Sequence, residues 1–89
     1  MGEFGSELLT PTLIRAARAL LRYDQATLAE KTGISKKTIG LIETMDTAPT
    51  DARRRRILEQ LRTKMEDDLH VEFVFAGTKT GEGVRLRRR

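Results

Sequence analysis

Apolar side chains recur at spacings of three and four residues along most of the chain, which is the period of helices with one buried side. A first helix is predicted to begin at Thr10 or Pro11, since proline is well tolerated at the first helical position, and to end near Arg22. The side of this helix that we expect to be buried carries Leu13, Ala16, Ala17, Leu20 and Leu21.

Two shorter helices are predicted on either side of Gly33, which suits the left-handed conformation that ends many helices. Asp24 is the expected N-cap of the helix before Gly33, and Ser35 is the expected N-cap of the helix after it. Two helices joined by a turn of about three residues form a helix-turn-helix arrangement. The inward positions of the two helices are Leu28, Ala29, Ile39 and Ile42.

A fourth helix and a β-hairpin complete the predicted fold, which is mainly α with a C-terminal β-hairpin. Thr50 is the expected N-cap of this helix, after a polar loop at residues 45–49. The apolar residues then alternate, which is strand spacing, and they predict an antiparallel hairpin of residues 71–75 and 84–88. The inner stripe of the helix is Ile57, Leu58, Leu61 and Met65, and the facing pairs expected in the hairpin are Phe75–Val84, Phe73–Leu86 and Glu72–Arg87.

Length and charge narrow the class of protein. A chain of 89 residues is long enough for one small domain with a modest core. Its formal net charge of +4 favours a polyanionic partner, nucleic acid first and a membrane surface second. The absence of cysteine excludes disulfides and suits the cytoplasm. We expect residues 1–6 to be a vector-derived tail, residues 7–68 a helix-turn-helix domain, and residues 69–89 a hairpin dimerisation element with a basic end.

No pattern of catalytic or metal-binding residues is present in the sequence. It contains neither a nucleophile–base pair, nor a phosphate-binding loop, nor a zinc-ligand spacing. His70 is the only histidine, and the acidic residues 66–68 are typical of a solvated helix end. We therefore expect no enzymatic activity, no cofactor and no metal ion.

The predicted helix that follows Ser35 contains residues that are unfavourable for an isolated helix. Lys36 and Lys37 place positive charge in its first turn, where the helix dipole is already positive. Gly40 lowers the stability of its interior by roughly 1 kcal/mol relative to alanine. All three lie on the outward side, opposite Ile39 and Ile42. Lysines at this position suit phosphates and guanine acceptors in the major groove of DNA, where the second helix of such a unit binds.

The segment RAARALLRYDQATLAEKTGISKKTIGLIE, residues 15–43, resembles the phage repressor/Cro (Xre-type) helix-turn-helix family. The matching pattern is a glutamine at the start of the second helix, Leu-Ala in its middle, and then Gly-Ile-Ser, Thr-Ile and Ile-Glu. The resemblance extends from about Leu13 to Leu61. Many members have a fifth helix where this chain has the predicted hairpin, so the family's dimer contacts do not transfer.

The resemblance implies roles for individual residues. It places Gln25 against a phosphate, Lys36, Lys37 and Leu41 where the family reads bases, and Thr38 near a phosphate or a thymine methyl group. It also implies an ion pair between Arg18 and Glu43. With Arg53 expected at the DNA backbone, the predicted DNA-binding set is Gln25, Ser35, Lys36, Lys37, Thr38, Gly40, Leu41, Thr44 and Arg53.

The hairpin suggests self-association, because an isolated two-stranded hairpin is marginally stable in water. A homodimer with a shared four-stranded sheet would solve this problem and would place two recognition helices about 34 Å apart on a palindromic site. The predicted dimer interface is Val71, Phe73, Phe75, Val84 and Leu86.

The sequence thus favours a cytoplasmic, sequence-specific transcription regulator that binds double-stranded DNA, acts as a homodimeric repressor and is open to control by a partner protein. Two alternatives remain at this point. One is a protein-interaction module with the same fold, such as an antitoxin or an antiactivator. The other is RNA binding through the sheet and the basic C-terminal residues.

Overall fold

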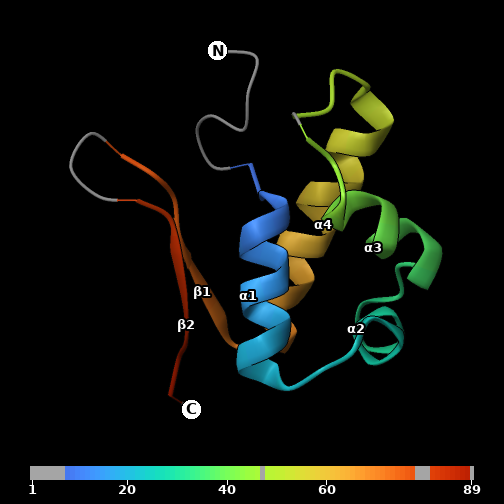
Figure 1. Ribbon diagram of the computed structural model, residues 1–89. Helices are drawn as coiled ribbons and strands as arrows, with labels where there is room; N and C mark the ends of the chain where they lie inside the picture. The colour runs from blue at the N-terminus through green and yellow to red at the C-terminus, as the bar shows by residue number, and fades with distance from the viewer. Residues whose placement is uncertain (1–7, 47, 78–80, 89) are drawn as a thin grey trace.

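The computed structural model describes residues 8–46, 48–77 and 81–88, in which four helices are followed by a two-stranded antiparallel sheet (Figure 1). This order confirms the predicted mainly α fold with a C-terminal hairpin. The expected tail at residues 1–6, the middle of the hairpin loop and Arg89 lie outside the described residues. The elements are α1 (Pro11–Leu21), α2 (Gln25–Thr32), α3 (Lys36–Glu43), α4 (Ala52–Asp68), β1 (Val71–Val74) and β2 (Gly83–Leu86).

Side-chain caps fix where the four helices begin. The predicted caps Asp24 and Ser35 are confirmed, and Thr10 caps α1 at the predicted start of that helix. Each of the three side chains accepts a hydrogen bond from a backbone N–H in the first turn. The prediction for α4 is wrong by one residue. Asp51, not Thr50, is its N-cap and accepts from the Arg53 N–H at 2.8 Å. A carboxylate accepts a stronger hydrogen bond than a hydroxyl and also complements the positive end of the helix.

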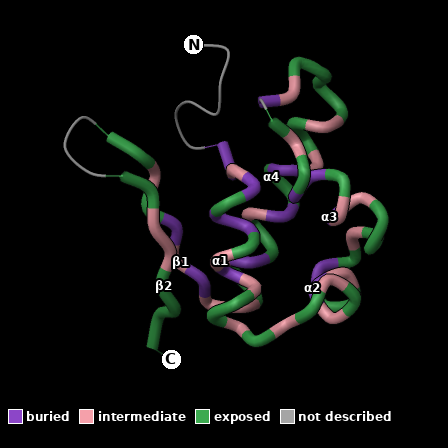
Figure 2. Tube along the Cα trace, viewed as in Figure 1, coloured by how far each residue is buried: buried purple, intermediate pink, exposed green. Residues whose placement is uncertain are grey.

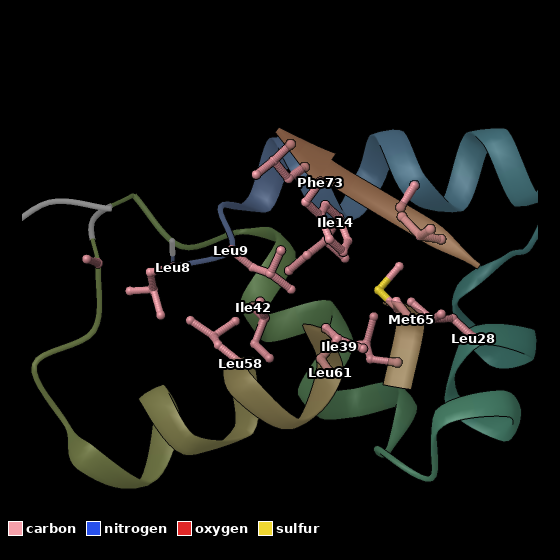
Figure 3. Close-up of a cluster of buried hydrophobic side chains, with 14 residues drawn as sticks. Leu8, Leu9, Ile14, Leu28, Ile39, Ile42, Leu58, Leu61, Met65 and Phe73 are labelled. Atoms are coloured by element: carbon pink, nitrogen blue, oxygen red, sulfur yellow. The ribbon is translucent and has the colours of Figure 1, made fainter. Parts of the chain in front are cut away.

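The hydrophobic core lies between the helices and the inner face of the sheet. Side chains from all four helices and from β1 meet there, as Figure 3 shows for Leu28, Ile39, Leu61 and Phe73. The expected burial of Leu20 is wrong, because its side chain is 44% exposed. The fully buried positions of α1 centre on Leu13, Ile14 and Ala17, and Leu20 lies at the edge of that stripe, where the helix ends.

The hairpin pairs in a different register from the one predicted. Glu72 lies opposite Arg85 rather than Arg87, and both strands end earlier than expected. The slip is two residues, so every side chain keeps its predicted face and the apolar alternation cannot distinguish the two registers. In the observed register the Arg85 guanidinium donates two hydrogen bonds to the Glu72 carboxylate, each at 3.0 Å. The observed partners are Val71–Leu86, Glu72–Arg85, Phe73–Val84 and Val74–Gly83.

The hairpin packs on α1 and α4, whereas α2 and α3 lie on the other side of α1 (Figure 1). Figure 2 shows that β1 contains buried positions, as the helices do. Val71 and Phe73 are buried in the chain's own core. These two residues are therefore not available to a second chain. Phe75 is half-buried, with the Arg62 guanidinium 4.7 Å from the centre of its ring. The hairpin thus completes the core of the helical domain.

Candidate nucleic-acid interface

The turn between α2 and α3 sets the direction of α3. Gly33 ends α2 with a φ of 76°, a left-handed conformation in which a residue with a Cβ atom is strained, and its N–H donates to the Ala29 carbonyl. Two residues later the Ser35 hydroxyl accepts from the Thr38 N–H at 3.1 Å and donates to the Thr38 hydroxyl at 2.8 Å. Gly33 thus sets the turn after α2, and Ser35 fixes the first turn of α3 through its two hydrogen bonds with Thr38.

Helix α3 divides into a buried side and an exposed side. Ile39 and Ile42 are fully buried in the core. On the opposite side Gly40 is half-buried, and four predicted DNA-binding residues are exposed: Lys36, Lys37, Leu41 and Thr44; Thr38 is half-buried at the boundary between the two sides. The sequence prediction placed all of these residues except Thr38 on one face, and the structure brings them together there.

Glu43 is the only carboxylate of α3, and it is turned into the protein. It is 5% exposed and accepts from Arg18 through both oxygens, from Nε at 2.7 Å and from Nη2 at 2.9 Å. Gln25 Nε2 donates to the same carboxylate at 3.1 Å, and the Arg15 guanidinium donates to the Glu43 carbonyl. These bonds connect α1, α2 and α3, and they remove the helix's negative charge from its exposed face.

The ionised form of Glu43 is favoured in this position. Burial raises the pKa of its carboxyl, but the hydrogen bonds from Arg18 and Gln25 and the charges of Arg18 and Arg15 outweigh burial and hold the pKa below its ordinary value. The bond to Glu43 also raises the pKa of Arg18. The resemblance implied the Arg18–Glu43 pair, whereas nothing in the sequence pointed to the bonds from Gln25 and Arg15.

Gly40 provides the surface on which the Gln25 amide lies. A Cβ atom built at Gly40 would be 3.6 Å from Gln25 Oε1, which is ordinary van der Waals contact. Gln25 is thus held between Gly40 and Glu43, half-buried at the start of α2. An alanine side chain would fit at position 40, so packing within the chain does not require the glycine.

The other charged side chains near this face differ in their surroundings. Hydrogen bonds from Thr27 lower the pKa of Asp24, and the positive charge of Lys36 lowers it further, so the carboxylate offsets part of that lysine's charge. Arg53 is exposed at the first turn of α4. The C-terminal arginines are partly engaged elsewhere, because Arg85 pairs with Glu72 and the Arg87 guanidinium donates to a carbonyl of α4.

The fold and this face define a helix-turn-helix DNA-binding domain. A family model described as helix-turn-helix matches residues 14–67, which is more than half of the chain. The chain therefore belongs to the Xre-type helix-turn-helix family of DNA-binding transcription regulators. Searches of curated proteins and of solved structures find no match.

Two further features concern the described residues alone. None of the helices within the described ranges combines the length and the apolar character that crossing a membrane requires. In the same part of the chain, no three side chains among His, Asp and Glu gather into a group that could hold a metal ion.

Proposed function

We propose that the chain is a transcriptional repressor that binds a palindromic operator as a homodimer, with α3 in the major groove. One observation carries this proposal. The exposed face of α3 holds Lys36 and Lys37, while the one carboxylate of that helix is buried against Arg18. A helix face that has cations and no exposed carboxylate of its own attracts phosphates and suits the guanine O6 and N7 acceptors.

Residues around α3 supply the supporting contacts in this proposal. The Gln25 amide has two N–H groups, and its bond to Glu43 uses one, so the other is available to a phosphate oxygen. The hydroxyls of Ser35, Thr38 and Thr44 lie at the two ends of α3, where they can reach the backbone or a base edge. Arg53 anchors the DNA backbone from α4. Bound in this way, the protein represses by excluding polymerase from a promoter.

The homodimer in the proposal forms through the hairpin. Val74 and Leu86 are exposed apolar residues of the two strands, and the two-stranded sheet has unpaired outer edges within the described residues. A second copy that adds its own hairpin would cover these groups and create the two-fold symmetry that a palindromic site requires. Sedimentation velocity at micromolar concentration tests this step, and a monomer with full DNA affinity would remove the dimer from the proposal.

A gel-shift titration tests DNA binding. The probe is the duplex upstream of the protein's own gene, at physiological salt, against the wild type and a Lys36→Ala/Lys37→Ala variant. An Arg56→Ala/Lys64→Ala variant is the control, since it also removes two positive charges, but from exposed positions of α4. We expect the α3 variant to lose binding and the α4 variant to bind nearly as tightly as the wild type.

Two results would contradict the proposal. Equal loss in both variants would show that net charge, rather than the α3 face, determines affinity. Full binding by the α3 variant would mean that the DNA-contacting site is misplaced and does not include this face. In that case charge reversal at Lys36 and Lys37 should leave the activity of the protein in the cell unchanged.

A further inference from the structure

The exposed face of α3 contains one large apolar side chain, that of Leu41. It is 48% exposed, which is the highest value among the large hydrophobic residues of the described chain that stand at the surface. Lys37 lies one helical turn before it, and the Thr44 hydroxyl donates to its carbonyl at 3.0 Å. Leu41 is therefore an apolar group surrounded by the residues proposed to contact DNA.

An apolar side chain in the major groove has one matching feature on the base edges. Thymine presents its C5-methyl group there, whereas adenine, guanine and cytosine present hydrogen-bonding groups. Leucine can contact this methyl group but cannot satisfy a donor or an acceptor. Facing any other base, Leu41 would remove water from a polar edge without replacing its hydrogen bonds, which is unfavourable.

The surroundings of Leu41 allow close approach to a base. Gly40 precedes it and has no side chain, and the Gln25 amide lies against that glycine instead of projecting beside Leu41. Side chains one turn apart on a helix are about 5–6 Å from each other, a distance close to the separation of bases one or two steps apart along B-DNA. Lys37 and Leu41 can thus contact neighbouring base pairs in the same half-site.

We infer that Leu41 is a specificity-determining residue that contacts the C5-methyl group of a thymine in each half-site of the operator. This inference rests on the proposed function, because it requires α3 to lie in the major groove. It adds the identity of one base to that function. It also explains why an exposed position, where a polar side chain would interact better with water, is occupied by leucine.

The experiment uses duplexes that the wild-type protein enriches from a random DNA library. Each thymine of the enriched half-site is replaced by deoxyuridine, which keeps the base pair and removes only the methyl group. We expect one position in each half-site at which this change weakens wild-type binding by about fourfold per methyl group, from the burial of a single methyl group.

Two variants make the test specific. Leu41→Ala should bind the enriched duplex more weakly and should show no further loss at the deoxyuridine position. Leu20→Ala is the matched control, because Leu20 is an exposed leucine of α1, and it should respond to deoxyuridine as the wild type does. Melting curves by circular dichroism verify that both variants are folded.

The outcomes separate this inference from the proposed function. If no duplex is enriched, the proposed function fails and the assignment of Leu41 fails with it. If a duplex is enriched but deoxyuridine weakens the wild type and Leu41→Ala equally, or has no effect at any position, only the thymine assignment is overturned. Leu41 would then be free to contact a protein partner.

Discussion

Replacing Arg18 by methionine should destabilise the fold more than replacing its partner Glu43 by glutamine. The carboxylate side chain of Glu43 is 4% exposed, whereas the Arg18 side chain is 21% exposed. Without Arg18, the carboxylate keeps only the hydrogen bond from Gln25 to its oxygens and the charge of Arg15 nearby. Without the negative charge of Glu43, the guanidinium still reaches water and donates to the Tyr23 carbonyl.

The expected magnitudes follow from this asymmetry. Leaving one charge of a buried pair without its partner costs about 3–5 kcal/mol. Because Gln25 and Arg15 remain, we expect the lower value of about 3 kcal/mol for Arg18→Met, or a decrease in Tm of about 12–24 °C for a domain of this size. Glu43→Gln keeps the shape of the side chain and one oxygen that accepts from Arg18, so it should lower the free energy of unfolding by only about 1–2 kcal/mol.

Urea denaturation followed by circular dichroism measures these free energies of unfolding. An Arg18→Met/Glu43→Leu double variant should be more stable than Arg18→Met alone, because it removes the buried charge together with its partner. The penalty of Arg18→Met should also shrink as the pH falls, because without Arg18 the Glu43 carboxyl takes up a proton more readily than in the wild type. A cost of Arg18→Met below about 1 kcal/mol, or a double variant that is no more stable than Arg18→Met alone, would contradict this asymmetry.

Three further predictions concern pH, capping and salt. The pKa of Glu43 is lowered on folding. The stability that its ionised form provides is therefore present above the pKa of the unfolded chain, 4.5, and is lost as the pH falls through the lower pKa of the folded protein. Urea midpoints should fall less steeply below pH 4.5 for Glu43→Gln than for the wild type. Asp51→Ala should lower the stability by about 1 kcal/mol, whereas Thr50→Ala should leave the urea midpoint nearly unchanged, and a larger effect at Thr50 would contradict the observed cap. Arg53→Ala should reduce the slope of log affinity against log salt concentration by about 0.9 if Arg53 contacts one phosphate, and an unchanged slope in gel shifts would place Arg53 off the DNA.

The sequence predicted those parts of the fold that depend on interactions close together in the chain. Asp24 and Ser35 were recognisable because a cap and the N–H that it accepts from are three residues apart. Gly33 was recognisable because few other residues adopt its conformation readily. The exposed face of α3 followed from helical period alone, since two buried isoleucines fix which side is outward.

Features that depend on distant segments were not predictable in the same way. A strand register that slips by two residues leaves the apolar alternation unchanged. The sequence therefore offered Glu72 two equally suitable cross-strand partners, Arg85 and Arg87, and the structure pairs it with Arg85. Alternation also assigned Val71 and Phe73 to an apolar face without indicating that the chain's own helices cover it. The bond from Gln25 to Glu43 joins residues of two helices, and its geometry exists only once those helices pack.

Gly40 connects the stability of α3 with its proposed role. Alanine at this position would add about 1 kcal/mol of helix stability and would meet Gln25 only at ordinary contact distance, so the fold alone does not select glycine. The remaining difference between the two residues is a methyl group on the outward side of α3, next to the Gln25 amide. If that space is occupied by DNA, Gly40→Ala should raise the urea midpoint and weaken binding to the enriched duplex at the same time. A variant that gained stability and kept full affinity would show instead that no part of the DNA comes close to α3 at this point.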